Sequence, residues 1–435
     1  MKTWYRSGTA LCLAAGLLLT ACTPALRLPN PFAAVQQITC KAIPIGVVIG
    51  ADGIPAAQDQ QEGYDLAAQQ INQAGGIQGC PIRLVYNRTE GDGTNPDAVQ
   101  AAMLELADGG QVAVLGATSS AATKRIAAIS QYIKMPVVIT PDTSDDLMAN
   151  GSAWIFRINP AESSYASTAF DMVKDTLGPA ARVAILYDQS EFGTSASGTA
   201  GNAALNHGLT LGLFLGYSLA STDFTTLLNQ VRGASPDVLY LISTDPKQAR
   251  GILSEIASQG LKIPLVIGNG SGFTSHDFLY DASGKLNAGL NGLAMTVPWS
   301  ADLKGRANPE FIQRLTAWRK ATHATAVAPA ALGTVQAYTA LQLVCAAILE
   351  TAKASPHNWN AILANRDQLD AYRGELDQTL RGFKAAQHPS LLGPVEFDAQ
   401  GQNRAGAVIV QALNGSLAAV YPQADATQSL VLSGR

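Results

Sequence analysis

The chain has 435 residues, of which 47% are hydrophobic and 14% are charged, and its formal net charge is −4 at pH 7. A chain of this length is too long for one hydrophobic core and suits two domains. It has no run of basic residues and no basic residues interleaved with aromatic ones, so we expect no nucleic-acid partner.

The N-terminus predicts export. A short basic region precedes a largely apolar stretch, Leu11 to Ala21, which has the length of a secretory signal. Small residues close the stretch before Cys22, an arrangement that resembles the lipobox of bacterial lipoproteins. We therefore expect a signal peptide at residues 1–21, lipidation of Cys22 and a proline-containing tether at residues 22–39. The alternatives are a plain secretory signal and a transmembrane anchor, and the latter needs about 20 apolar residues.

Beyond the tether, short β-rich runs alternate with helical patterns, which predicts an α/β fold with helices on both faces of parallel sheets. The first series of strands and helices is expected over Ile43–Gly50, Gln60–Ala74, Ile82–Asn87, Pro96–Asp108, Val112–Gly116, Ala121–Tyr132 and Pro136–Thr140. The pattern restarts around Phe156–Pro160. The second series is expected over Ser163–Leu177, Arg182–Asp188, Thr194–Asn206, Thr210–Tyr217, Phe224–Arg232, Val238–Ser243, Pro246–Gln259 and Leu265–Gly268. Two series of this size predict two doubly wound parallel-sheet lobes.

The last part of the chain is predicted to be helical from Pro309 to about Lys384 and to end in strands over Val395–Phe397 and Ala407–Leu413. Its stretch Ala324–Leu349 has no charged side chain, but polar residues interrupt it. A helix buried inside a soluble domain therefore explains this stretch better than a membrane span.

A long helical segment after both sheets suggests that the chain returns to the first lobe, so that several crossings form a hinge. We expect lobe 1 to contain residues 40–157 and 297–394, and lobe 2 to contain residues 158–296 and 395–435.

The cysteines of the mature chain predict one disulfide. Cys40 and Cys80 each stand just before a predicted strand. If these strands are parallel neighbours, both thiols lie at the same end of the sheet, within reach of each other. Cys345 falls in the apolar helical pattern and is expected to be a small core residue.

Several segments resemble the leucine/isoleucine/valine-binding family of bacterial periplasmic binding proteins. Among them are Ile45–Val47, the helix end and double glycine of Ala67–Gly79, Met135–Val137, and Gly393–Asp398. The glycines of the second segment have a physical role, because they end a helix and turn the chain into the next strand. The similarity runs from about residue 43 to residue 415.

This resemblance implies the type I periplasmic binding protein fold and a function. The chain would be an extracytoplasmic, lipid-anchored solute-binding protein of an ABC importer, and not an enzyme. It would capture a small polar or amphipathic solute, such as an amino acid, an amide or a carboxylate-bearing compound, and dock as a monomer on permease subunits. A ligand-sensing receptor on the same fold is the alternative, because both proteins need the same cleft.

Ligands of such folds bind beyond the carboxyl ends of the strands. Hydroxyl groups stand there in the first lobe, because Ser119 and Ser120 follow one predicted strand while Thr143 and Ser144 follow the next. Hydroxyls and backbone N–H groups at helix amino ends bind carboxylates well. With the resemblance, Ser120 and Thr143 are the expected carboxylate contacts, although each hydroxyl could instead simply cap a helix.

The second lobe departs from the family pattern. Phe192 stands where a tyrosine is frequent, Thr244 stands where an aromatic residue is common, and the loop that begins at Asn269 lacks the acid that commonly holds an ammonium group. Asp142 is a candidate substitute, and without one an ordinary α-amino acid is a doubtful ligand. Tyr165 is expected to face the cleft, where it and Phe192 could sandwich a ligand.

Other chemistry has little support. The glycine cluster Gly268–Gly272 lacks the spacing of a dinucleotide-binding or Walker loop. The five histidines are scattered without paired spacing, so we expect no metal site. There is no G-x-S-x-G motif, and we expect no cofactor and no catalytic residues.

Overall fold

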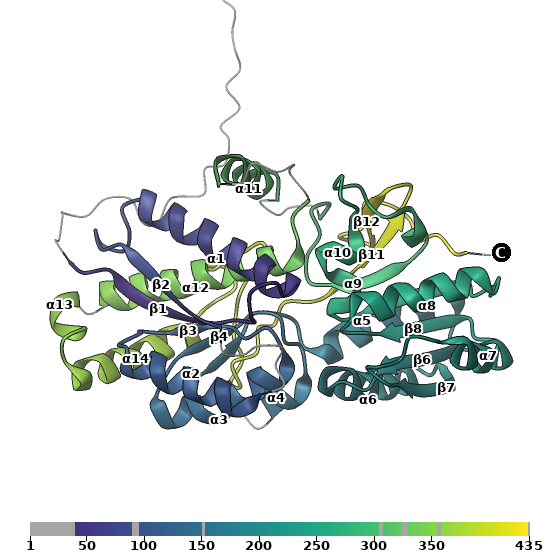
Figure 1. Ribbon diagram of the computed structural model, residues 1–435, viewed down its shortest axis with the longest axis horizontal. Helices are drawn as coiled ribbons and strands as arrows, with labels where there is room; N and C mark the ends of the chain where they lie inside the picture. The colour runs from purple at the N-terminus through teal and green to yellow at the C-terminus, as the bar shows by residue number, and fades with distance from the viewer. Residues whose placement is uncertain are drawn as a thin grey trace, which may run out of the picture.

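The computed structural model describes residues 40–88, 95–149, 153–303, 308–322, 329–354 and 358–433. The predicted signal peptide, Cys22 and the tether lie outside these residues. Two β-sheets lie side by side, each with helices on both faces, and together they form an elongated two-lobed molecule (Figure 1).

The sheet of the first lobe is wholly parallel and has the strand order β2-β1-β3-β4-β5. Its strands are β1 (Ile43–Val48), β2 (Ile82–Asn87), β3 (Val114–Leu115), β4 (Val137–Ile139) and β5 (Ile155–Arg157). The connecting helices are α1 (Pro55–Gln73), α2 (Pro96–Asp108), α3 (Ser120–Ile133) and α4 (Asp145–Ala149).

The sheet of the second lobe has the order β12-β11-β10-β9-β8-β6-β7. Its parallel strands are β6 (Arg182–Asp188), β7 (Thr210–Tyr217), β8 (Val238–Ile242), β9 (Leu265–Asn269) and β10 (Ala294–Val297). The hairpin of β11 (Val408–Leu413) and β12 (Ser416–Tyr421) adds an antiparallel edge. The helices are α5 (Glu162–Leu177), α6 (Glu191–Asn206), α7 (Thr225–Ala234), α8 (Pro246–Ser258), α9 (Ser271–Thr274), α10 (His276–Leu279) and the 3-10 turn η1 (Ala288–Leu290).

The two doubly wound lobes predicted from the sequence are confirmed, with differences in detail. The strands β5 and β10 and the helix α4 were not predicted, because each is only three to five residues long and has little local periodicity. The predicted strand Val395–Phe397 is wrong. These residues are apolar because they pack in the core of the first lobe, and their backbone makes only an isolated bridge between Phe397 and Asn403.

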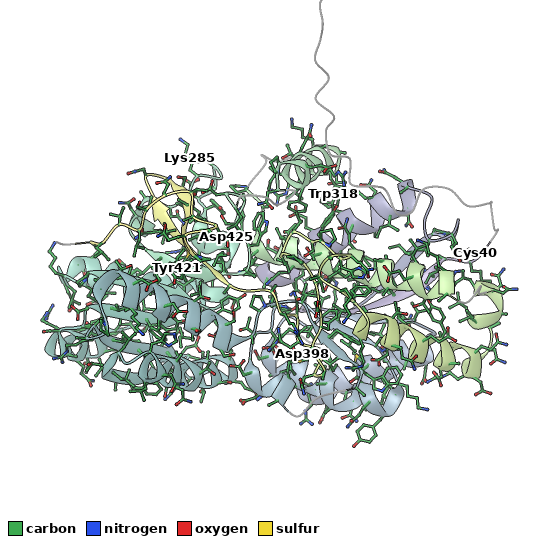
Figure 2. All side chains as sticks on the ribbon, turned by 180° about the vertical axis from the view of Figure 1, so that it is seen from behind. Cys40, Lys285, Trp318, Asp398, Tyr421 and Asp425 are labelled. Atoms are coloured by element: carbon green, nitrogen blue, oxygen red, sulfur yellow. A yellow bond between two sulfur atoms is a disulfide. The ribbon has the colours of Figure 1, made fainter. Side chains whose placement is uncertain are left out.

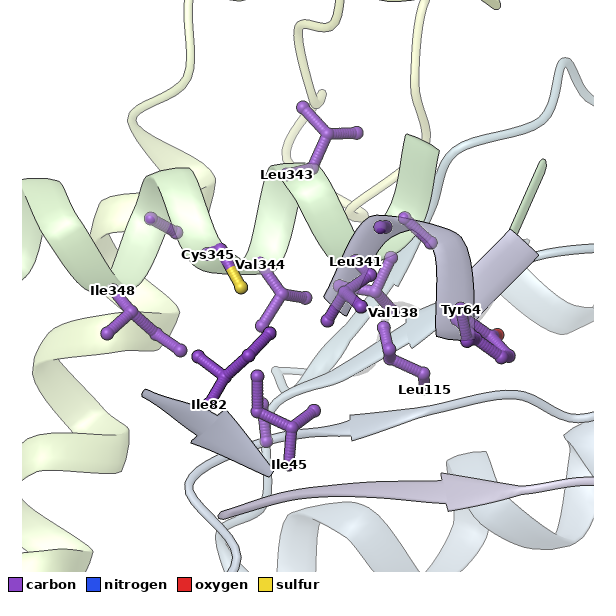
Figure 3. Packing of buried hydrophobic residues seen from close by; sticks show 14 of the residues in the cluster. Ile45, Tyr64, Ile82, Leu115, Val138, Leu341, Leu343, Val344, Cys345 and Ile348 are labelled. Atoms are coloured by element: carbon purple, nitrogen blue, oxygen red, sulfur yellow. The ribbon is translucent and has the colours of Figure 1, made fainter. Parts of the chain in front are cut away.

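The chain returns to the first lobe after β10, as the helical pattern suggested. This part forms α11 (Asn308–Thr322), α12 (Leu332–Ala354), α13 (Trp359–Ile362) and α14 (Arg366–Arg381). All four helices contribute side chains to the same core as β1 and β2. The close-up in Figure 3 shows Leu341, Val344 and Ile348 of α12 beside Ile45 and Ile82 of the sheet.

Helix α12 is long and apolar enough to cross a membrane, but it is a core helix. Within its most apolar 18-residue window, 78% of the residues are buried inside the protein. It packs closely on α1, where a Cβ added at Gly63 would lie 2.1 Å from the carbonyl oxygen of Thr334. The buried-helix interpretation is confirmed for the part of this stretch that lies in α12, whereas residues 324–328 lie outside the described residues.

The structure joins Cys40 and Cys80, the pair for which the sequence predicts a disulfide, with their Cα atoms 5.6 Å apart. Cys40 lies at the end of the first lobe that faces away from the second (Figure 2). The turn before Cys80 depends on Gly76, which has a φ of 70° and where a Cβ would lie 2.1 Å from the Cys80 carbonyl oxygen. Cys345 is a free, buried thiol.

Three crossings join the lobes, and two of them are bonded to each other. Asn403 donates its backbone N–H to the carbonyl of Arg157 (2.9 Å) and its side-chain amide to that of Ile158 (2.8 Å). The Gln402 amide donates to the carbonyl of Asn159 (2.7 Å). Asp398, near the middle of the molecule in Figure 2, accepts the Gln402 N–H (2.9 Å). We propose that this third crossing begins after Phe397, later than residue 395, because Phe397 still packs in the first core.

Candidate ligand-binding site

A cavity of about 580 Å³ lies between the two lobes, at the carboxyl ends of their parallel strands. Its volume is in the range of small-molecule sites. Eight of the nine predicted contact residues line it: Ser119, Ser120, Asp142, Thr143, Tyr165, Phe192, Thr244 and Asn269. Ser144 is not part of the lining. Its hydroxyl pairs with that of Ser195 (3.1 Å) and its carbonyl accepts from Arg157.

The amino end of α3 faces the cavity. The Ser119 side chain caps this helix by accepting the Ala122 N–H at 3.2 Å, and Ser120 is the first helical residue. The neighbouring Thr118 hydroxyl accepts the Gly50 N–H (3.0 Å) and donates to the Gln60 side chain (3.1 Å). Capping, one of the two roles considered for these serines, is therefore what Ser119 does in this structure.

Asp142 is 4% exposed, and its carboxylate is only half satisfied. Its Oδ1 atom accepts the Ser144 N–H at 2.8 Å, while its Oδ2 atom is buried and makes no hydrogen bond to the described residues. Burial raises the pKa of Asp142, and the Ser144 N–H, the Arg157 guanidinium and the nearby Ser120 hydroxyl partly offset that rise. One oxygen of this buried carboxylate is therefore not used in a hydrogen bond within the described part of the chain.

Glu162, which the sequence analysis did not identify, connects the two lobes behind the cavity wall. Its carboxylate accepts the Thr143 hydroxyl (2.7 Å) and the side-chain amide of Asn269, which also accepts from Thr296 (3.0 Å). Burial raises the pKa of Glu162 to about 7. Because the Thr143 proton is directed at Glu162, the hydroxyl oxygen faces a ligand as an acceptor, which suits an N–H donor better than a carboxylate.

The polar groups of the second-lobe wall are largely bound to one another. The backbone N–H and hydroxyl of Thr244 both donate to Asp188, which is fully buried and also accepts from the N–H and hydroxyl of Ser190. Tyr165 is 4% exposed, and burial raises its pKa well above the usual value. Phe192 is partly buried against the second-lobe core.

Three acids line the cavity, Asp59, Asp142 and Glu191, and none of the described lining residues is Lys, Arg or His. Asp59 was missed because the predicted helix began one residue later. Pro55, at the first helical position, is the signal that would have extended α1. Burial and the neighbouring Glu62 raise the pKa of Asp59 to about 7, and Arg319 opposes the rise.

The two lobes are in contact at the rim of the cavity through α6 of the second lobe. Lys124 of α3 pairs with Glu191 of α6 at 2.5 Å. Nearby, the Ser195 hydroxyl donates to Asp146 (3.1 Å) and the Thr199 hydroxyl to Asp145 (3.2 Å). Each of these contacts joins the first lobe to α6 of the second.

The family profile described as periplasmic binding protein matches residues 42–416. This chain belongs to the periplasmic binding protein family. Its members bind solutes, and their type I fold is the one described above. Within the ranges that the structure describes, no group of three or more His, Cys, Asp or Glu side chains could hold a metal ion.

Curated relatives include the Leu/Ile/Val-binding protein homolog 8 of Brucella abortus (strain 2308), 26% identical over 224 residues, which are 50% of this chain and 55% of that protein. The Leu/Ile/Val-binding protein homolog 7 of Brucella melitensis biotype 1 is 23% identical over the same shares. The chain thus spans about half the length of the curated relatives it matches.

Solved structures share the fold. A branched-chain amino acid transporter substrate-binding protein from Streptococcus pneumoniae, in complex with isoleucine, has a TM-score of 0.68 at 19% identity and covers 90% of this chain and 100% of its own. A solute-binding protein from R. palustris in complex with benzoate has a TM-score of 0.68 at 16% identity and covers 90% and 97%. These neighbours were solved with chemically different ligands, so the fold alone does not specify the solute.

Proposed function

We propose that this protein captures a small polar or amphipathic solute in the cavity between its lobes and delivers it to an ABC importer from outside the cytoplasm. The observation that carries the proposal is the cavity itself, which both lobes line at the carboxyl ends of their parallel strands. The bonded crossings support it, because a hinge lets two lobes close on a ligand.

Binding is proposed to involve Ser119, Ser120, Asp142 and Thr143 from the first lobe, with Tyr165, Phe192, Thr244 and Asn269 from the second. Ser144 is proposed to act indirectly, because its hydroxyl contacts Ser195 of the second lobe. The rings of Tyr165 and Phe192 offer apolar area, and the acceptors of Asp142 and Thr143 orient polar groups of the solute.

The membrane-bound part of the proposal rests on the sequence. Lipidation of Cys22 would hold the protein at the membrane surface, close to permease subunits. Metabolic labelling with a radioactive fatty acid tests this step. Wild-type protein should be labelled and Cys22→Ala should not, whereas labelling of both would place the anchor elsewhere.

Native mass spectrometry of the purified protein tests the binding function. We expect a small molecule bound in a 1:1 ratio, which can be released and identified. A thermal-shift screen of amino acids, amides and aromatic acids should then raise the melting temperature with members of one chemical class. A protein that carries no solute and responds to no compound would contradict the proposal.

Uptake separates an importer subunit from a sensor on the same fold. Deletion of the gene should abolish uptake of the radiolabelled solute by cells, and restoration of the full-length gene should recover it. Undiminished uptake in the deletion strain would contradict the transport role and leave solute binding intact.

A further inference from the structure

The charge inside the cavity is one-sided. The ionisable side chains of its described lining, apart from the buried Tyr165 phenol, are the carboxyls of Asp59, Asp142 and Glu191. Glu191 is neutralised by Lys124, with which it forms an ion pair of 2.5 Å. Asp59 and Asp142 have no such cation in direct contact, so acids outnumber cations along the described lining of the cavity.

Asp59 lies on α1, and no cation among the charged groups described near it is free to pair with its carboxylate. It forms no hydrogen bond or ion pair with the described residues, and Glu62 and Asp277 are close enough to repel its charge. Arg319 attracts it, but this guanidinium is committed to Glu62 through two hydrogen bonds of 2.6 Å. Thr334 also donates to Glu62, at 2.9 Å. Among the described residues, Asp59 therefore has no cation of its own.

Asp142 gives a second, independent indication from another element. Its Oδ2 atom is buried without a partner in the described structure, although the residue lines the cavity. A buried carboxylate oxygen without a hydrogen bond is costly, and a ligand that donates one relieves the cost. Both acids would therefore bind hydrogen-bond donors of a ligand, and Asp59 would bind a cationic one.

We propose that the solute carries a basic group other than an α-ammonium, such as a side-chain amine or an amidinium, and that Asp59 is the carboxylate that pairs with it. The inference rests on the proposed function, because it presumes a small solute in this cavity. Asp142 and the Thr143 oxygen then accept further N–H donors, while the amino end of α3 binds any negative group of the same solute.

This assignment separates the chain from a binder of simple carboxylates or of amino acids with aliphatic side chains. Benzoate offers no donor and would bring a third unpaired negative charge into the cavity. An aliphatic side chain against Asp59 would leave that carboxylate desolvated and unpaired, which disfavours the complex. An amine at this position gains a charge-assisted hydrogen bond instead.

The test uses matched pairs of probes that differ by one terminal ammonium group. L-lysine is compared with L-norleucine, and L-ornithine with L-norvaline, by calorimetry, with benzoate as a fifth probe. We expect the member with the terminal side-chain ammonium group, in at least one pair, to bind at least tenfold more tightly than its partner and than benzoate. Asp59→Asn keeps the size of the side chain and should reduce that preference to less than threefold.

Asp97→Asn is the matched control, because Asp97 is an exposed acid at the start of α2, outside the cavity lining. Its binding preferences should equal those of the wild type. Circular dichroism melting shows whether each variant is folded, and the more conservative change Asp59→Glu should restore part of the preference if Asp59→Asn folds poorly.

The possible outcomes are distinguishable. Equal or tighter binding of L-norleucine, L-norvaline or benzoate overturns the inference and leaves the solute-binding function standing. If no probe binds, the solute found by native mass spectrometry decides. A basic group in it other than an α-ammonium, with loss of the solute in Asp59→Asn, supports the inference, and a solute without such a group overturns it. A protein with no solute and no bound probe contradicts the proposed function itself.

Discussion

The acids that line the first wall of the cavity and those that lie behind its second wall differ in how many hydrogen bonds the protein makes to them. In the second lobe, Asp188 accepts four hydrogen bonds from Ser190 and Thr244, and Glu162 accepts from Thr143 and Asn269. In the first lobe, Asp142 has an unpartnered oxygen and Asp59 has no hydrogen bond within the described chain.

This difference suggests that the acids of the two lobes have different roles, one in stability and the other in binding. Bonds made within the protein hold loops in place, so the second-lobe acids are expected to act mainly on stability. Acceptors without partners raise the free energy of the empty protein and are relieved when a ligand donates to them. The first-lobe acids are therefore expected to act mainly on binding.

The largest expected effect is on stability in the second lobe. Asp188→Ala leaves the N–H and hydroxyl groups of Ser190 and Thr244 without their buried acceptor, and should lower the free energy of unfolding by about 3–5 kcal/mol. Urea denaturation of the ligand-free protein measures this. The control Asp52→Ala removes a side chain that is 85% exposed and should cost less than about 1 kcal/mol. An equal loss of unfolding free energy in both variants would show that Asp188 is no more important for stability than an exposed acid.

In the first lobe the expected effect is on binding. Ser120→Ala combined with Thr143→Ala should weaken solute binding at least tenfold, a loss of about 1.4 kcal/mol or more. Thr244→Ala makes a matched change in the second wall, where the hydroxyl is bonded to Asp188, and should change affinity less. Calorimetry with the identified solute measures both, and a larger loss in Thr244→Ala would reverse the assignment.

The stability of the ligand-free protein should depend on pH through Asp59. Its pKa is about 7 in the folded protein against 3.8 for the ordinary group, so the folded state binds more protons between these values. The contribution of Asp59 is therefore favourable at low pH and is lost as pH rises from about 4 through about 7.

The variant Asp59→Asn, which cannot ionise, isolates this effect from the neighbouring Glu62, Asp277, His276 and Arg319. Its melting temperature minus that of the wild type should increase from pH 4 to pH 7 by a few degrees and then level off above about pH 8. A difference in melting temperature that stays constant with pH would show that the negative charge of Asp59 is compensated in the folded protein.

The smallest expected effect concerns the rim. The side chains of Lys124 and Glu191 are 38% and 43% exposed, so their ion pair across the lobes contributes little. Lys124→Ala should weaken solute binding about twofold, and the difference should shrink in 1 M salt because exposed pairs are screened. A loss beyond tenfold would mean that the rim, and not the cavity, determines affinity.

Much of the fold was predictable because its elements carry their own local signals. The predicted bounds of β2, α2, β6 and β7 are those of the structure. The sequence-based predictions were wrong where long-range contacts determine the structure. Strand β10 is only four residues long and forms because it pairs with β9 and β11. Val395–Phe397 was predicted as a strand because it is apolar, but it is apolar because it packs in the core of the first lobe.

The sequence located several residues that line the cavity, but it could not show how the charges in and around the cavity are paired. Strand ends and helix caps located Ser119, Ser120 and Thr143, because the carboxyl ends of parallel strands meet at one edge. The partners of Glu162 come from residues 19 and 107 positions away in the chain, so no local pattern could identify it. The isolation of Asp59 depends on Arg319 being committed to Glu62, a contact across 257 positions.

A crystal structure of the protein with its co-purified solute tests the central claim most directly. The account predicts one solute molecule between the lobes, in contact with the amino end of α3 and with Phe192, and with a basic nitrogen within hydrogen-bond distance of Asp59. Density for the solute outside this cavity, or an empty cavity in protein shown by mass spectrometry to be loaded, would contradict it.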